Sequence, residues 1–200
     1  MGEMTVTARS LIAFLAGTGV ALLAGWVAFP QFLYERSQQP LQFSHKVHAE
    51  AGSSCKDCHA LGEDGRFAGI PGVAKCAECH SVPLGTTPAE KKLVDVHVAN
   101  NREIPWRVYS RQPDNVWLPH AVNLNRAKLA CEECHADHGN TGALRPYERN
   151  RISGYSRDIW GVSLARTTAP KHQRPGMKMS DCEDCHAAKR VSAGCLACHK

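Results

Sequence analysis

Hydrophobic and polar residues divide the chain into one long apolar run near the N-terminus and a polar remainder. No Asp, Glu, Lys or Arg occurs over residues 10–34. At about 1.5 Å per residue, about 20 helical residues cross the roughly 30 Å hydrocarbon core of a bilayer. Arg9 precedes the run, and Trp26 and Tyr34 lie near its far end, where aromatic side chains favour the membrane interface. The pattern predicts a transmembrane helix over residues 10–34, preceded by a cytoplasmic tip at residues 1–9.

The residues after Ala24 distinguish a membrane anchor from a cleavable signal peptide. A signal peptide has a shorter apolar core and a cleavage site between small residues, whereas Trp26, Val27, Phe29 and Pro30 follow here. We therefore favour an uncleaved signal-anchor over a cleaved signal or a buried core helix. The proline is expected to end or kink the helix, because its ring is incompatible with an uninterrupted helical hydrogen-bond ladder.

Residues 41–200 contain few long periodic stretches, and Gly and Pro interrupt most of them. We expect mostly loop with short α-helices. Residues 89–101 are the exception, since their apolar positions predict a short amphipathic helix. Residues 104–117 are expected to be extended, because Pro105 and Pro113 disfavour helix. A chain of this kind buries too little aliphatic surface on its own, so its core is expected to include cofactors.

The cysteines supply those cofactors with a means of attachment. All ten belong to Cys-x-x-Cys-His motifs, which are Cys55-Cys58-His59, Cys76-Cys79-His80, Cys131-Cys134-His135, Cys182-Cys185-His186 and Cys195-Cys198-His199. A disulfide framework gives no reason for a histidine after every second cysteine. Zinc sites combine two such units to reach four ligands, and five units cannot be shared evenly.

Cys-x-x-Cys-His is the attachment signature of c-type haem, in which two thiols add to the porphyrin and the adjacent imidazole becomes the proximal iron ligand. The sequence thus predicts five covalently attached haem c groups. In bacteria such attachment takes place outside the cytoplasmic membrane, so we expect a single-pass protein of the inner (cytoplasmic) membrane with residues 41–200 on the periplasmic side.

The charge balance is compatible with this prediction. The chain has 24 Lys and Arg against 19 Asp and Glu, a formal net charge of +5. Ferric haems with ionised propionates bring about −1 each, which nearly cancels this excess. Nucleic-acid binding is therefore disfavoured, and the arginine-rich stretch at residues 145–160 is expected to contact haem propionates or a partner.

An internal half-repeat divides residues 41–200. His45 precedes Cys55 by ten residues, and His120 precedes Cys131 by eleven. We expect a module at residues 41–88 with haems 1 and 2, a linker at residues 89–117, and a module at residues 118–200 with haems 3, 4 and 5.

The remaining histidines and two methionines are candidates for the distal side of the irons. Low-potential multihaem carriers use imidazole on both sides, and a methionine sulfur raises the potential. The distal candidates are His45, His48, His120, His138, His172, Met177 and Met179. His45 and His48 are expected to serve haem 1 and a different haem, while His172, Met177 and Met179 compete for one iron. His97 is expected to be a surface or outer-shell histidine, because no haem motif lies near it in sequence.

Stretches outside the haem motifs resemble a known family. "FSHKVH", "EDGRFAGIP", "IPWRVYSRQPDNV", "RPYERNRISGYSRDIWG" and "GMKMSDCEDCH" are similar to the membrane-anchored multihaem cytochrome c subunit of the menaquinone reductase complex Qrc of sulfate reducers. The pentahaem subunit of alternative complex III is a more distant resemblance. The family implies a fold like that of cytochromes c3 and c7, with short helices packed around covalent haems and one N-terminal transmembrane helix.

The resemblance also implies partners and a role. The partners are a molybdopterin-oxidoreductase-like subunit, an iron–sulfur subunit and an integral membrane quinone-binding subunit. A soluble periplasmic cytochrome, such as a tetrahaem cytochrome c3, would donate electrons that pass toward menaquinone. The alternatives are a quinol-oxidising complex that sends electrons outward, a free-standing anchored cytochrome, and a multihaem reductase with an open iron. The resemblance implies six haems where this sequence has five motifs, so a sixth would be held without thioether bonds.

Overall fold

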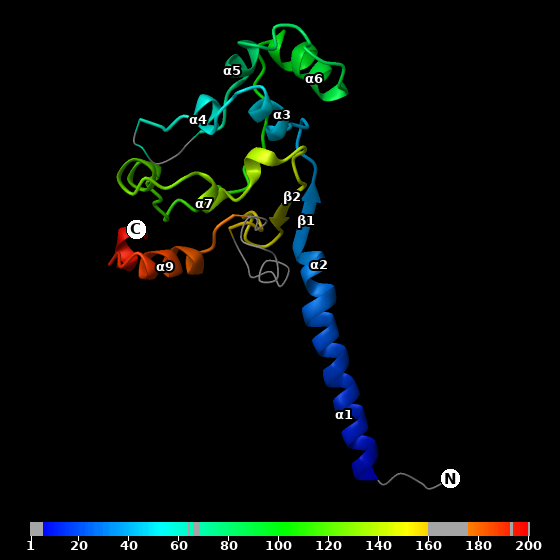
Figure 1. Cartoon of the computed structure of the whole chain (residues 1–200). Coiled ribbons are helices and arrows are strands. Elements are labelled where there is room, and N and C mark those ends of the chain that lie inside the picture. The colour runs from blue at the N-terminus through cyan, green and yellow to red at the C-terminus, as the bar shows by residue number, and fades with distance from the viewer. Residues whose placement is uncertain (1–5, 64, 66–68, 160–175, 193, 200) are drawn as a thin grey trace.

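The structure is a computed structural model that describes residues 6–63, 65, 69–159, 176–192 and 194–199. A helical rod extends from a domain of short helices and loops (Figure 1). The elements in chain order are α1 (Val6–Leu23), η1 (Ala24–Ala28), α2 (Phe29–Leu33), β1 (Tyr34–Ser37), α3 (His45–Glu50), α4 (Cys55–Cys58), α5 (Val73–Ala77), α6 (Pro88–Lys92), η2 (Leu93–Val98), η3 (Val122–Arg126), α7 (Glu132–His135), η4 (His138–Asn140), β2 (Tyr147–Asn150), α9 (Met179–Ala188) and η6 (Cys195–Ala197).

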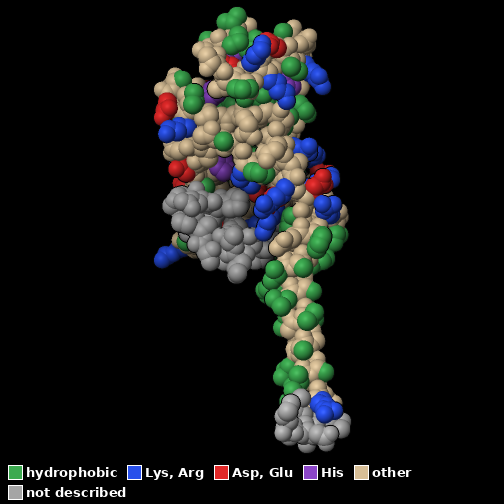
Figure 2. All heavy atoms as spheres, turned by 90° about the vertical axis from the view of Figure 1, so that its right-hand side faces the viewer, with side chains coloured by type: hydrophobic (Ala, Val, Ile, Leu, Met, Phe, Trp, Pro, Cys, Tyr) green, Lys and Arg blue, Asp and Glu red, His purple; other side chains and the backbone are tan. Residues whose placement is uncertain are grey.

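The rod consists of α1, η1 and α2. Thr7–Leu33 has a mean hydropathy of 2.1, with no part of its most apolar window buried, and is long enough to cross a membrane. Hydrophobic side chains line the rod, whereas acidic and basic side chains gather where it joins the domain (Figure 2). The rod therefore has the composition of a membrane anchor and lies outside the core of the domain.

Pro30 does not end this rod, which continues to Leu33. Proline has no N–H to donate, and its ring clashes with the carbonyl four residues earlier. The helix accommodates it with the π-helical turn η1, in which the Phe29 N–H donates to the Ala24 carbonyl five residues back. The proline is thus absorbed by a local widening of the helix.

A two-stranded antiparallel sheet fastens the rod to the domain. Strand β1 pairs with β2, with Tyr34 opposite Asn150 and Ser37 opposite Tyr147. Cross-strand ion pairs join Arg36 to Glu148 at 2.6 Å and Arg149 to Glu35 at 2.8 Å. Because β1 follows the rod directly, the ladder fixes the position of the domain relative to the anchor.

The arginine-rich stretch packs against the extended linker at residues 104–117. The Tyr109 hydroxyl donates to the Arg145 carbonyl, and the Arg145 guanidinium lies 4.1 Å from the centre of the Tyr109 ring. Arg145 also pairs with the buried Asp158, and Arg157 pairs with Glu148 at 2.9 Å. The arginines at positions 145, 149 and 157 therefore bind carboxylates of the protein itself.

The protein core is small. The helix expected at residues 89–101 is present as α6 and η2, and it packs on α5. Leu41, Leu93 and Ile104 form the main buried cluster, with Trp106 and Cys76 at its edge. The described part of the chain buries six hydrophobic residues in all, so most of its side chains lack an aliphatic core to pack on. This agrees with the expectation of short helices that enclose cofactors.

Candidate haem sites

Each Cys-x-x-Cys-His motif forms one helical turn. The carbonyl of the first cysteine accepts the N–H of the motif histidine at 2.8 Å in the first motif and at 2.9 Å in the second, third and fifth. The fourth motif lies within the helix α9. Residues at i, i+3 and i+4 share one face of a helix, so both thiols and the imidazole of a motif project on the same side. That is the arrangement that attachment to a porphyrin edge and to its iron requires.

The ten thiols are arranged neither as disulfides nor as zinc sites. All ten cysteines are free, and within the described ranges no three His, Cys, Asp or Glu side chains converge as metal ligands. Burial raises the pKa of the Cys76, Cys134 and Cys182 thiols above its ordinary value.

The rings of His48 and His80 lie 6.0 Å apart between their centres. Two imidazoles on opposite faces of one iron have centres about 6 Å apart, because metal–nitrogen bonds are about 2 Å long and each nitrogen is about 1 Å from its ring centre. The Nδ1 atom of His48 donates to the Ser44 carbonyl at 2.8 Å, and that of His80 donates to the Glu90 carboxylate at 3.1 Å. Since both partners only accept, the neutral tautomer of each ring carries its proton on Nδ1 and directs Nε2 to a metal.

A second pair with this spacing is His120 and His135. Their ring centres are 6.3 Å apart and their planes are nearly parallel, at 9°. Burial lowers the pKa of His135, and the nearby His138 and His120 rings lower it further. The ring is thus held in the neutral form that binds a metal.

The rings of His45 and His138 lie near the first motif. Burial lowers the pKa of His45 to about 4, with His59, His138 and His48 contributing in that order. The Thr141 hydroxyl lies 3.3 Å from His45 Nδ1 and donates to the His138 carbonyl, so it accepts from His45. Nδ1 of His59 donates to the Gly69 carbonyl at 2.8 Å. His45 and His138 are therefore the two candidates for the distal side of this iron.

His97 does not lie at the surface, which was one of the two positions expected for it. Its side chain is only 4% exposed, and Nδ1 donates to the Arg102 carbonyl at 3.1 Å. The π-helical turn η2 carries it inward together with Leu93 and Val94. This burial was not predicted, because the surrounding residues have the pattern of an ordinary amphipathic helix.

The distal candidates of the two C-terminal motifs are only partly described. His172 lies outside the described residues. Met179 is 55% exposed at the start of α9, and Met177 is half-buried. Within the described residues no imidazole ring stacks across from His186 or His199.

The five motifs form a single file whose spatial order differs from the sequence order. From the end farthest from the rod tip, Figure 1 places α5, α4, α7 and α9 in succession, with the C-terminal motif beside α9. Burial raises the pKa of four thiols, and a thiol of the neighbouring motif raises each of them further in the same order: Cys58 acts on Cys76, Cys131 on Cys55, Cys182 on Cys134, and Cys198 on Cys182. The last motif is held by an isolated β-bridge between Val116 and His199. The second motif of the sequence is therefore the first of the file.

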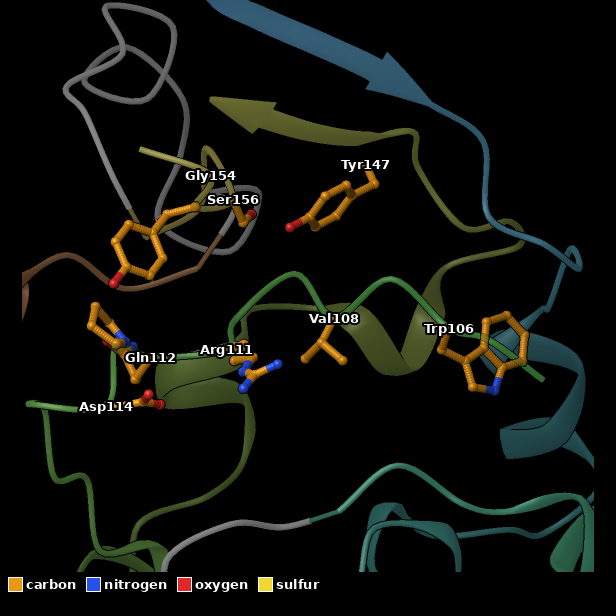
Figure 3. A pocket seen from close by; sticks show the side chains of 10 residues that line it. Trp106, Val108, Arg111, Gln112, Asp114, Tyr147, Gly154 and Ser156 are labelled. Atoms are coloured by element: carbon orange, nitrogen blue, oxygen red, sulfur yellow. The ribbon is translucent and has the colours of Figure 1, made fainter. Parts of the chain in front are cut away.

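One pocket lies apart from the file. It has a volume of about 340 Å³ and is lined by residues of 106–114 and 147–156, with the Arg111 and Tyr147 side chains among them (Figure 3). No cysteine or histidine lines it. The pocket therefore lies between the linker and the segment that contains β2, and it is not one of the candidate haem sites.

Glu90 is a residue at these sites that the sequence pattern did not predict. Thr87 and Glu90 stand at the N-cap and N3 positions of α6, which is the ordinary pattern of a helix start. The carboxylate nevertheless contacts His80, ten residues away. The sequence pattern thus indicated only a helix start, whereas Glu90 also accepts a hydrogen bond from a motif histidine.

Comparison with known proteins shows the family of the chain. Residues 30–106 match the Class III cytochrome C family. The chain is 39% identical to the menaquinone reductase, multiheme cytochrome c subunit, of Nitratidesulfovibrio vulgaris (strain Hildenborough), and the match covers 94% of this chain and 89% of that protein. Taken with five attachment turns and paired imidazoles, this identity shows that the chain belongs to the family of multihaem cytochrome c subunits of menaquinone reductase.

Proposed function

We propose that this protein is the electron-transfer subunit of a membrane-bound menaquinone reductase complex. The observation that carries the proposal is the file of attachment turns, in which imidazole rings face one another at the spacing of two axial ligands. The likeness to a menaquinone reductase subunit over nearly the whole chain supports the same role. Bound haem would supply reversible one-electron oxidation and reduction of its iron.

The residues of the chain would hold five haem c groups. The thiols of each motif bind the porphyrin, and His59, His80, His135, His186 and His199 are the proximal ligands. His48 is the distal partner of His80, and His120 is that of His135. His45 or His138 completes the first site, while His172, Met177 and Met179 remain the candidates for the last two. Irons held by protein on both sides offer no open position to a substrate, which favours electron transfer over substrate reduction.

The apolar rod would anchor this subunit in the inner membrane, with the haem domain at residues 41–200 on the periplasmic side. The ladder between β1 and β2 holds the domain against the end of the rod. A soluble periplasmic cytochrome of the c3 type would be the donor. A molybdopterin-oxidoreductase-like subunit, an iron–sulfur subunit and an integral membrane quinone-binding subunit would complete the complex.

The test is purification of the protein from its native membrane in mild detergent. We expect it to elute with the three partner subunits, to be reduced by a reduced c3-type cytochrome, and to be reoxidised when a soluble menaquinone analogue is added. Elution as a single free chain would contradict the complex. Reduction by menaquinol, with no reoxidation by the quinone, would instead indicate a complex that sends electrons outward.

A further inference from the structure

Glu90 makes a hydrogen bond that distinguishes His80 from the other motif histidines. Its carboxylate accepts from Nδ1 of His80 at 3.1 Å, and its side chain is 14% exposed. His59, by contrast, donates to the neutral carbonyl of Gly69. Among the described residues, no carboxylate is bonded to the ring of any other motif histidine.

The surrounding backbone holds this carboxylate in place. The Leu84 N–H donates to one oxygen at 2.7 Å and the Gly85 N–H to the other at 2.8 Å. In an ordinary capping box the N3 carboxylate bonds the backbone N–H of the N-cap residue. Here the Thr87 hydroxyl caps the Glu90 N–H at 3.2 Å, while the carboxylate is turned toward the loop and the histidine.

Gly85 makes room for this arrangement. A Cβ atom at that position would lie 2.8 Å from Oε2 of Glu90, closer than real Cβ contacts allow. The Leu84 and Gly85 N–H groups donate to the two oxygens of Glu90 and thereby favour the ionised carboxylate, which is the ordinary form of a glutamate at neutral pH. The group facing His80 is therefore a negative charge held in a fixed position.

We propose that Glu90 is a positioning residue that lowers the reduction potential of the haem attached at Cys76 and Cys79. A carboxylate on Nδ1 fixes the tautomer and orientation of a ligating imidazole and makes its Nε2 more basic. A more basic ligand beside a negative charge stabilises ferric iron, which carries the greater positive charge, more than ferrous iron. Because this motif lies at the end of the file farthest from the rod, the structure places a low-potential site at the membrane-distal end.

The inference rests on the part of the proposed function that attaches a haem at Cys76 and Cys79, and not on the direction of electron flow. Its test is a redox titration of the purified complex with Glu90→Gln, followed by optical and EPR spectroscopy. The step of the titration that belongs to this haem is identified as the one missing from a Cys76→Ala/Cys79→Ala variant, and it is the component followed in the other variants. We expect that component alone to move to a more positive potential in Glu90→Gln, with an unchanged number of haems and a retained low-spin signal.

Glu78→Gln is the matched control. It removes one negative charge next to the same motif, but Glu78 is exposed and pairs with Lys75 at 2.7 Å rather than with a ligand. We expect a smaller shift, because solvent screens that charge. Gly85→Ala tests the same contact without changing any charge, since the added methyl group displaces the carboxylate, and it should shift the component in the same direction.

The outcomes separate the two proposals. A component that stays at the wild-type potential in both Glu90→Gln and Gly85→Ala overturns the role of Glu90. An equal shift in Glu78→Gln overturns it as well, because the effect would then be one of net charge. A wild-type protein without a haem at Cys76 and Cys79 would contradict the proposed function itself. If Glu90→Gln does not accumulate, Gly85→Ala decides the question.

Discussion

At the scale of single residues, the hydrogen bond on Nδ1 determines what each imidazole can do. Ser44, Gly69 and Glu90 each accept a hydrogen bond from Nδ1 of one ring, which leaves Nε2 on the opposite side for a metal. These acceptors come from different parts of the chain, and each fixes the orientation of its ring. The motif cysteines and proximal histidines are readable from sequence because their spacing is local. The pairing of His48 with His80 is not, because it joins rings 32 positions apart.

Removing a distal imidazole should open one iron. His48→Ala leaves the site of His80 with one protein ligand, and His120→Ala does the same for His135. In each variant we expect one haem to become high-spin in the ferric EPR spectrum and to bind carbon monoxide when reduced. His97→Asn is the control, because His97 is equally a histidine but has no ring partner among the described residues. Fully low-spin spectra in both alanine variants would contradict the assigned pairs.

At the scale of elements, the apolar rod is predictable and its attachment to the domain is not. The rod follows from 25 consecutive uncharged residues, because a bilayer requires that composition. Strands β1 and β2 have the sequences YERS and YERN, which lack the alternation of apolar and polar residues that indicates a strand. Their cross-strand ion pairs link positions more than a hundred residues apart, and sequence patterns carry no information about such pairing.

Among the ion pairs described at the junction between the rod and the domain, we expect those of Glu148 to contribute most to stability. It accepts from both Arg36 and Arg157, and its side chain is 18% exposed. We expect Glu148→Ala to lower the free energy of unfolding by about 1–2 kcal/mol, because it leaves two arginines without their shared partner. Denaturant unfolding in detergent, followed by haem absorbance, measures this.

The control for that variant is Glu35→Ala. Glu35 forms a single pair with Arg149, and both side chains are about half exposed. The expected loss is below about 1 kcal/mol, since exposed pairs contribute little. Equal losses in the two variants would show that Glu148 has no special part in holding the rod to the domain.

At the scale of the whole molecule, the order of the motifs in space is the feature that sequence reasoning could not supply. The loops after the first three motifs are long and contain several Gly and Pro residues, so many paths are compatible with their lengths. The observed path places the motif of Cys76 at the end farthest from the rod tip and the two C-terminal motifs at the other (Figure 1). The reversal of the first two motifs relative to their sequence order was not predicted.

Because the motifs form a single file, loss of the middle motif should impair electron transfer along the file more than loss of a terminal motif. We expect Cys131→Ala/Cys134→Ala to divide the remaining haems into a membrane-distal pair and a membrane-proximal pair. In stopped-flow mixing with a reduced c3-type cytochrome, the distal pair should be reduced at the wild-type rate and the proximal pair at least about tenfold more slowly, because electron exchange falls off steeply with separation. The control, Cys195→Ala/Cys198→Ala, removes a terminal motif and should leave a single fast phase. A single fast phase in both variants would contradict the file.

If the proposed function is correct, this chain carries haem at every motif and has no open iron. The ratio of haem to protein in the natively purified complex, determined together with its ferric EPR spectrum, tests both points. We expect five covalently bound haems per chain, all of them low-spin. Fewer than five haems, or a large high-spin signal that changes when nitrite is added, would contradict it.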